Sequence, residues 1–206
     1  MNNVIQILIS VGAIMPNDHF VGTSGRHLEA YINKDALYPH TKETSLIGAY
    51  FAEAHKGLDI HLVAGPAMGG IILSQWTARH LSELKEKEIL SVYAEKKEGV
   101  LTLTRGYDAL VKGKNVLVVE DLTTTGGSLA AVIDLVKKAG GSVLAASVMV
   151  NRDPEYVSES SFGVPFTSLA EYRTPSYTAE ECPMCKQNMP INLSLGHGAK
   201  FLAEKK

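Results

Sequence analysis

Two adjacent acids and a run of small hydroxyl and glycine residues stand between positions 120 and 128. Glu120 and Asp121 follow an apolar run, and a helical pattern begins after Ser128. Glycines let the backbone approach a ligand closely, and the free N–H groups at the start of a helix favour an anion. Hydroxyl groups add further donors. The residues of this turn are therefore expected to bind a phosphate: Thr124, Thr125, Gly126, Gly127 and Ser128.

Two carboxylates beside a phosphate would repel it, so Glu120 and Asp121 need another purpose. They make sense if the ligand also has hydroxyl groups to bind, or if it carries a divalent cation. The implied ligand is a sugar phosphate with magnesium.

The elements around this motif alternate between strand and helix. The apolar run 116–120 reads as a buried strand, and 128–139 reads as a helix that ends at two glycines. Such alternation predicts an α/β fold in which helices flank a parallel sheet, with ligands at the carboxyl ends of the strands. The other expected elements are helices at 3–13, 41–55 (capped by Thr41) and 71–87, a hairpin within 20–36, and strands at 60–64, 89–94, 143–150 and 166–169. Residues 95–113 are polar and weakly patterned.

Composition excludes several classes of protein. The 206 residues are 45% hydrophobic, which supports a core, and the net charge of −2 argues against a nucleic-acid-binding protein. No stretch of transmembrane length is free of charge, and the apolar N-terminus lacks the basic leader of a secretory signal. With two cysteines and no signal, the expected compartment is the cytoplasm.

A second glycine-rich turn, residues 65–70, follows the 60–64 strand and precedes a helix. Its position suits a second anion. The alternative is a tight turn in which the glycines serve geometry alone, and taken by itself the turn favours neither reading.

The 116–128 stretch resembles the phosphoribosyl pyrophosphate (PRPP) signature of type I phosphoribosyltransferases. The resemblance implies that Glu120 and Asp121 contact the ribose hydroxyls and that the turn after them cradles the 5′-phosphate. It also implies that Ala67, Gly69 and Gly70 bind pyrophosphate. Thr123 departs from the aliphatic residue usual in the family. The alternative for the stretch is an ordinary strand–helix connection with a capped helix.

Two further segments resemble orotate phosphoribosyltransferases. In that family a serine-glycine-basic segment lines the active site, which implies roles in substrate binding for Ser24 and Arg26; Thr23 replaces a lysine found in many members. An arginine in the place of Arg152 binds the orotate carboxylate, a role that suits a planar guanidinium, although Asn151 and Asp153 differ from the family in type. The alternatives are an exposed hairpin arginine and a surface ion pair.

The resemblance weakens in residues 94–107, where orotate enzymes carry a basic loop that closes over pyrophosphate. This segment has no histidine and is shorter. A cation is needed there because charge grows on the leaving group in the transition state. Lys96 is the best match, and Lys97 and Arg105 could share the task. The alternative is a solvated charged loop.

Cys182 and Cys185 form a closely spaced pair in the C-terminal segment. Zinc takes four ligands, and the chain has no second cysteine pair. His197 could supply a ligand, or a symmetric partner could supply two more cysteines. A packed turn is the favoured interpretation over zinc, and no histidine is given a catalytic role.

The chain is thus identified as a type I phosphoribosyltransferase closest to the orotate enzymes. The expected fold is a mostly parallel five-stranded sheet flanked by helices, with an N-terminal hood over residues 1–40, a core over 41–175 and a tail over 176–206. The resemblance implies PRPP and orotate as substrates, magnesium held with PRPP without direct protein ligands, and a homodimer. Alternatives are a transferase for another nucleobase and a non-catalytic PRPP-binding regulator, which would usually carry a DNA-binding module or basic face absent here.

Overall fold

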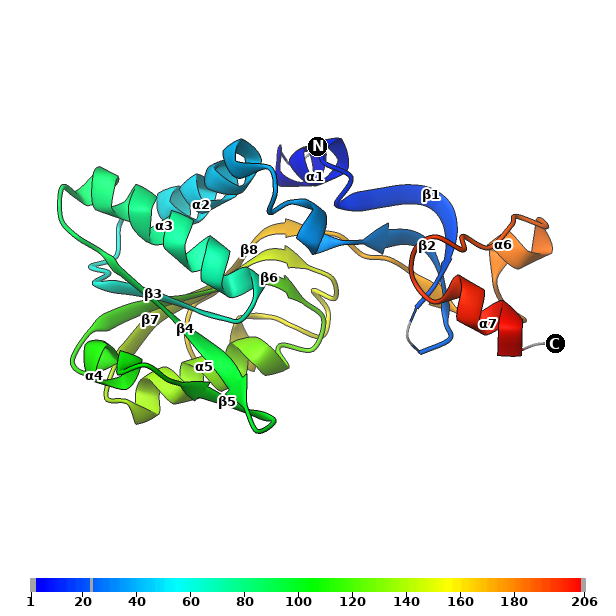
Figure 1. Cartoon of the computed structure of the whole chain (residues 1–206). Coiled ribbons are helices and arrows are strands. Elements are labelled where there is room, and N and C mark those ends of the chain that lie inside the picture. Colours follow the sequence, from blue (N-terminus) through cyan, green and yellow to red (C-terminus); the bar gives the residue numbers. More distant parts are fainter. Residues whose placement is uncertain (1–2, 23, 205–206) are drawn as a thin grey trace.

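The computed structural model describes residues 3–22 and 24–204, and its centre is one six-stranded sheet between two layers of helices (Figure 1). The spatial order of the strands is β5-β4-β3-β6-β7-β8, and all neighbours run parallel except the β4–β5 pair. Their bounds are β3 Leu62–Pro66, β4 Leu90–Lys97, β5 Val100–Leu103, β6 Asn115–Thr123, β7 Ser142–Asn151 and β8 Phe166–Glu171.

The helices cover the two faces of this sheet unequally. Three helices pack on one face with a core that includes Phe51 and Leu73, and α5 packs on the other with a core that includes Leu129 and Val136. The helical elements are α1 Asn3–Ser10, η1 Lys34–Ala36, α2 Thr41–His55, α3 Gly69–Lys85, α4 Tyr107–Val111, α5 Gly127–Lys138, η2 Glu159–Ser161, α6 Pro183–Lys186 and α7 Gly198–Glu204. None of the helices over the described residues combines the length and the apolar content that crossing a membrane requires.

The α/β class and the order of the elements are confirmed, but the predicted strand count of five is one short. The extra strand is β5, in the segment that showed no clear pattern. β4 continues to Lys97 and turns back through Glu98 and Gly99, both with positive φ, so that Lys97 pairs with Val100. This is the two-residue hairpin turn that suits the twist of antiparallel strands. Leu101 and Leu103 alternate with threonines and pack on the core, but the run of four residues is short and lies within a polar segment, so the sequence reading missed it.

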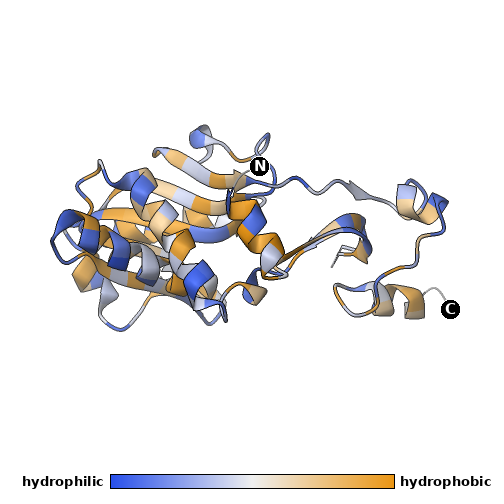
Figure 2. Cartoon of the chain, turned by 90° about the horizontal axis from the view of Figure 1, so that it is seen from above, coloured by the Kyte–Doolittle hydropathy of each residue, from blue (hydrophilic) through white to orange (hydrophobic). Residues whose placement is uncertain are grey.

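A second sheet of three short strands forms the hood. Strand β1 (Ile14–Val21) pairs antiparallel with β2 (His27–Ile32), and β2 pairs with β9 (Ser176–Tyr177). The tail then crosses the hairpin, where the amides of Asn192 and His197 donate to β1 carbonyls. Figure 2 shows this part of the chain extending away from the six-stranded sheet and its helices. Both ends of the sequence therefore build the hood.

The helix α2 begins at Thr41 as expected, but its capping residue is His40. The structure records no side-chain cap there; the Thr44 hydroxyl instead donates to the His40 carbonyl. The expectation that Thr41 caps this helix is therefore wrong, because the residue already lies in the first helical turn.

Candidate active site

The acid pair, Glu120 and Asp121, lies near the carboxyl end of the central strand β6. Residues Val116–Val119 before it are fully buried and hold the strand in the middle of the sheet. Glu120 is only 8% exposed and Asp121 only 6%. Two neighbouring carboxylates at such depth are costly unless they are neutralised or paired.

Asp121 is paired with two residues that sequence reasoning missed. The Lys34 ammonium lies 2.8 Å from its Oδ2, and the Tyr38 hydroxyl donates to the same oxygen over 2.9 Å. Burial lowers the pKa of Lys34, but the hydrogen bond and charge of Asp121 outweigh it and raise that pKa overall. Burial, followed by the charge of Asp121, raises the pKa of Tyr38. Lys34 was visible beside the Tyr31 segment, but nothing in the local sequence connected it to an acid 87 residues later.

Glu120 is neutralised in a different way. Burial, and then the charge of Asp121, raise its pKa to about 8, against the opposing effects of Lys34 and Ser128. Near neutral pH Glu120 therefore holds its proton, while Asp121 forms the ion pair with Lys34. A protonated carboxyl can donate a hydrogen bond to a sugar oxygen as well as accept one.

The phosphate turn, residues 124–128, is shaped by Thr123. The Thr123 side chain is buried, and its Oγ1 accepts a hydrogen bond from the Gly126 amide over 3.0 Å. Gly126 has φ of +78°, which favours glycine, and α5 begins at the next residue. The threonine that departs from the usual aliphatic residue thus stabilises the turn.

The glycine-rich turn at 65–70 is tighter than predicted. Strand β3 continues through Pro66 and α3 already begins at Gly69, so only Ala67 and Met68 connect them, through a cis peptide bond. A Cβ on Gly69 would collide with the Asp121 carboxylate and the Tyr38 hydroxyl. A Cβ on Gly70 would lie 2.6 Å from Pro66 Cδ. Gly69 is needed because the turn packs directly against Asp121 and Tyr38, and Gly70 because it packs against Pro66 and the Gly65 backbone.

A cavity of about 370 Å³ joins the two turns and the hairpin. We call it the phosphate cavity. Five predicted site residues meet there: Ala67, Lys96, Glu120, Gly127 and Ser128. Because parallel strands bring their carboxyl ends to one edge, motifs distant in sequence share this space.

The three candidate cations of the hairpin are placed differently. Lys96 lines the phosphate cavity. Lys97 is exposed like Lys96 but does not line this cavity, and the Arg105 Nε lies 3.2 Å from a Glu95 carboxylate oxygen. Of the three candidate cations, Lys96 is therefore the one that lines the phosphate cavity.

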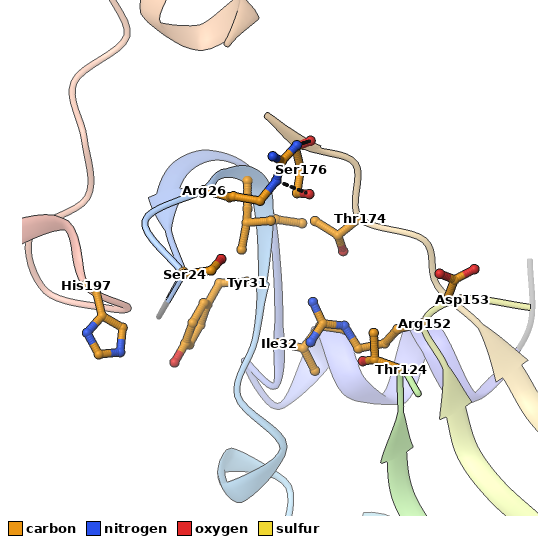
Figure 3. Close-up of a pocket in the computed structure, with 13 residues that line it drawn as sticks. Ser24, Arg26, Tyr31, Ile32, Thr124, Arg152, Asp153, Thr174, Ser176 and His197 are labelled. Atoms are coloured by element: carbon orange, nitrogen blue, oxygen red, sulfur yellow. Dashed lines mark hydrogen bonds between the residues drawn. The ribbon is translucent and has the colours of Figure 1, made fainter. Parts of the chain in front are cut away.

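A second cavity, of about 560 Å³, lies between the hood and the sheet edge (Figure 3). We call it the hood cavity. It unites Ser24 and Arg26 of the first hairpin with Thr124 and Arg152 from two other segments, together with Tyr31, Thr174 and His197. The phosphate turn divides the two cavities, since Thr124 lines one and Ser128 the other.

Arg152 points across the hood cavity. Figure 3 shows its guanidinium turned away from Asp153 and toward the hood strand that carries Tyr31 and Ile32. Burial lowers its pKa, and its Nε is buried without a hydrogen-bond partner among the described residues. Thr174 Oγ1, on the same wall, is likewise unpartnered among them. Buried donors without partners are costly, so the cavity is poised for a polar ligand with a negative charge.

Arg26 is engaged with the protein itself. Its Nε donates to Ser176 Oγ over 2.9 Å and its Nη2 donates to the Ser176 carbonyl over 2.6 Å (Figure 3). It joins the first hairpin to β9 while it lines the cavity. The neighbouring Thr23, noted as a departure from the family, lies outside the described residues.

Comparison with known proteins agrees with this geometry. Residues 33–171 match the model of the phosphoribosyl transferase domain family. The chain is 39% identical over 196 residues to the orotate phosphoribosyltransferase of Thermotoga maritima, covering 95% of this chain and 98% of that protein. Among solved structures, it is similar to the orotate phosphoribosyltransferase of Mycobacterium tuberculosis in complex with Fe(III) dicitrate, with a TM-score of 0.66, 19% identity and coverage of 83% and 97%. The enzyme from Aeropyrum pernix matches with a TM-score of 0.63, 25% identity and coverage of 82% and 93%.

Proposed function

The chain belongs to the phosphoribosyltransferase family, and we propose that it transfers the phosphoribosyl group of PRPP to orotate, giving orotidine 5′-phosphate and pyrophosphate. The observation that carries the choice of acceptor is Arg152. Arg152 lines a cavity that begins where the phosphate turn ends, and its buried Nε has no hydrogen-bond partner among the described residues. A planar guanidinium matches the carboxylate that distinguishes orotate from the other common nucleobases.

PRPP is expected to lie across the phosphate turn. The N-terminus of α5 and the hydroxyls of residues 124–128 bind its 5′-phosphate. The acid pair contacts the ribose hydroxyls, and the 67–70 backbone with Lys96 holds the pyrophosphate in the phosphate cavity. The base then occupies the hood cavity, contacted by Ser24 and Arg152, with Arg26 bracing the wall.

Magnesium fits this arrangement as part of the substrate. Asp121 already pairs with Lys34 and Tyr38, and Glu120 retains its proton near neutral pH, so neither is an open metal ligand in the substrate-free site. Mg²⁺ bound to PRPP would neutralise charge on the pyrophosphate as it leaves.

The transfer needs no covalent intermediate on the protein. A ring nitrogen of the base attacks the anomeric carbon, the bond from that carbon to the pyrophosphate oxygen breaks, and the configuration inverts. Asp121 stabilises the positive charge that develops on the ribose, and Lys96 stabilises the negative charge that grows on the leaving group. Positioning and electrostatics are therefore the whole contribution of the protein.

We further propose that the 1–40 hood and the 176–206 tail serve the base together with Arg152 of the core, and that the rest of the 41–175 core serves PRPP. A homodimer is expected from the family alone. Light scattering of the purified chain measures its mass and tests that expectation.

A spectrophotometric assay with PRPP, Mg²⁺ and orotate tests the activity through the loss of orotate absorbance. Arg152→Ala should lower kcat/KM for orotate by about 10- to 100-fold, the value of one or two charge-assisted hydrogen bonds, and leave PRPP affinity unchanged. Arg79→Ala, on the exposed face of α3, is the matched control. If PRPP binds and is consumed with another base but not with orotate, the proposed acceptor is wrong. If PRPP binds and no base reacts, the chain is a regulator.

A further inference from the structure

A compact group of metal-binding side chains lies away from both cavities. His19, His27, Cys182 and Cys185 place one ligand atom each within 4.8 Å of one another. Three of the four residues are buried, with His19 only 1% and His27 0% exposed. We call this group the His–Cys cluster. The cysteine pair was expected from the sequence, but the histidines were not; His197, considered as a ligand, lies on the hood cavity wall instead.

Two sulfur–nitrogen distances in the cluster are those of a tetrahedral site. The Cys185 Sγ lies 3.4 Å from His27 Nδ1, and the Cys182 Sγ lies 3.6 Å from His19 Nε2. A zinc ion with two sulfur and two nitrogen ligands sets such S–N separations at about 3.5 Å. The two histidine nitrogens lie 2.7 Å apart, so a bound ion would push the rings apart by roughly half an ångström.

The surroundings orient these atoms as ligands. His19 Nδ1 lies 2.8 Å from the Met189 carbonyl, the contact that fixes the ring so that Nε2 presents its lone pair to a metal. The Cys185 amide donates to Cys182 Sγ over 3.4 Å, which holds that sulfur toward the cluster. Pro183 begins the short helix α6 and sets the turn between the two sulfurs.

The fold brings the cluster together from the two ends of the chain. Val21 pairs with His27, and His19 lies two residues before Val21, so both rings stand on one face of the β1–β2 hairpin. The cysteines reach that face from the tail, 163 residues after His19 in the case of Cys182. Closing so long a loop is costly in entropy, and one metal ion would offset that cost.

We propose that the His–Cys cluster binds one structural Zn²⁺ ion that fastens the tail to the hood. Two thiolates and two imidazoles complete a tetrahedral shell and leave no open position for a substrate, so the site is structural and not catalytic. A redox function of the cysteine pair would leave two buried histidines beside it without a purpose. The packed turn favoured from the sequence likewise did not account for them.

The ion would affect binding of the base without contacting it, because it would hold in place two segments that line the hood cavity. The tail contributes Ser176 and His197 to the hood cavity, and the hairpin contributes Ser24 and Arg26. A metal that joins these two segments therefore holds two parts of the cavity wall together.

Metal analysis of the purified full-length chain tests the proposal without reference to activity. Chains made with zinc and dialysed under reducing conditions should contain about one zinc per chain. Apo protein, prepared with a chelator, should take up one Co²⁺ per chain and show the intense visible absorption of a tetrahedral thiolate site. Zinc-free protein that gives no such spectrum, or cysteines found joined in a disulfide after purification with reductant, would overturn the proposal.

Variants separate the cluster from accidental metal binding. Cys185→Ser and His19→Asn should each lose the bound zinc, and their melting temperature should no longer fall when chelator is added. His40→Asn, at an exposed position outside the cluster, is the matched control and should keep the metal. If a variant does not fold, the Co²⁺ titration of wild-type apo protein decides alone. Equal zinc content in the cluster variants and the control would refute the assignment.

Discussion

Replacement of Glu120 by glutamine should stabilise the substrate-free protein, and increasingly so as pH rises. The pKa of this carboxyl is raised from 4.5 to about 8 in the folded chain by burial and by Asp121. Between those two pH values the folded protein holds a proton that the unfolded chain has released. The free energy of unfolding of the wild type therefore decreases as pH rises through this window.

The size of the effect follows from the interval between pH and the ordinary pKa. At ~1.4 kcal/mol per pH unit, the penalty carried by Glu120 is roughly 1 kcal/mol at about pH 5, about 3 kcal/mol at about pH 7, and about 5 kcal/mol above pH ~8. Glutamine has nearly the same shape and no charge to desolvate. The advantage of Glu120→Gln should grow along the same series and then level off.

Urea denaturation at these three pH values, without PRPP or Mg²⁺, measures the free energy of unfolding of both chains. Glu88→Gln, at an exposed position on the loop before β4, is the matched control and should follow the wild type. If the curves of wild type and Glu120→Gln against pH run parallel, Glu120 is not titrating in the buried site, and the account of the acid pair fails.

Three further outcomes are expected. Lys96→Ala should lower kcat by about 100-fold, because Lys96 lines the phosphate cavity, whereas Lys97→Ala at the exposed neighbour should change kcat little; equal losses in the steady-state assay would contradict the placement. Gly48→Ala should destabilise the chain by about 1–3 kcal/mol in urea denaturation, because the new methyl group would lie 2.5 Å from Trp76 Cβ where α2 crosses α3; an unchanged midpoint would show that the helices can separate freely. Thr123→Val should raise KM for PRPP and cost about 1–3 kcal/mol of stability, because it removes the acceptor that holds the phosphate turn; KM and stability equal to the wild type would refute that role.

The parts of the fold that could be predicted from sequence are those with a local signal. The apolar run at 116–119 and the glycines after it predict a strand, a turn and a helix in that order. The helix ends at the two lysines, as expected. The β5 strand could not be predicted in this way. It lies at a sheet edge and spans only four residues, so the alternation of Leu101 and Leu103 with threonines was too short to separate a strand from a loop in a polar segment.

The residues of the candidate site also divide into those with a local sequence signal and those without one. Glu120, Asp121 and the phosphate turn form one continuous motif, so residue types alone point to a sugar phosphate. Lys34 and Tyr38 are bound to Asp121 through tertiary structure, and no spacing in the sequence links them to it. The partners of the cysteine pair were hidden for the same reason, since the pairing register of a hairpin decides that two histidines face one way.

The composition of the hood determines when, during synthesis of the chain, the hood can be completed. Residues 33–171 form the six-stranded sheet and most of its helices, whereas β9 and the segments that cross β1 come only afterwards. On the ribosome, the first hairpin must therefore wait through the synthesis of the entire core before its third strand arrives. A nascent chain released at about residue 171 would carry the groups that grip the sugar phosphate but only part of the wall around the base. Completion of the acceptor site is thus a late event of biosynthesis, and fusions or truncations at the C-terminal end should affect acceptor binding before donor binding.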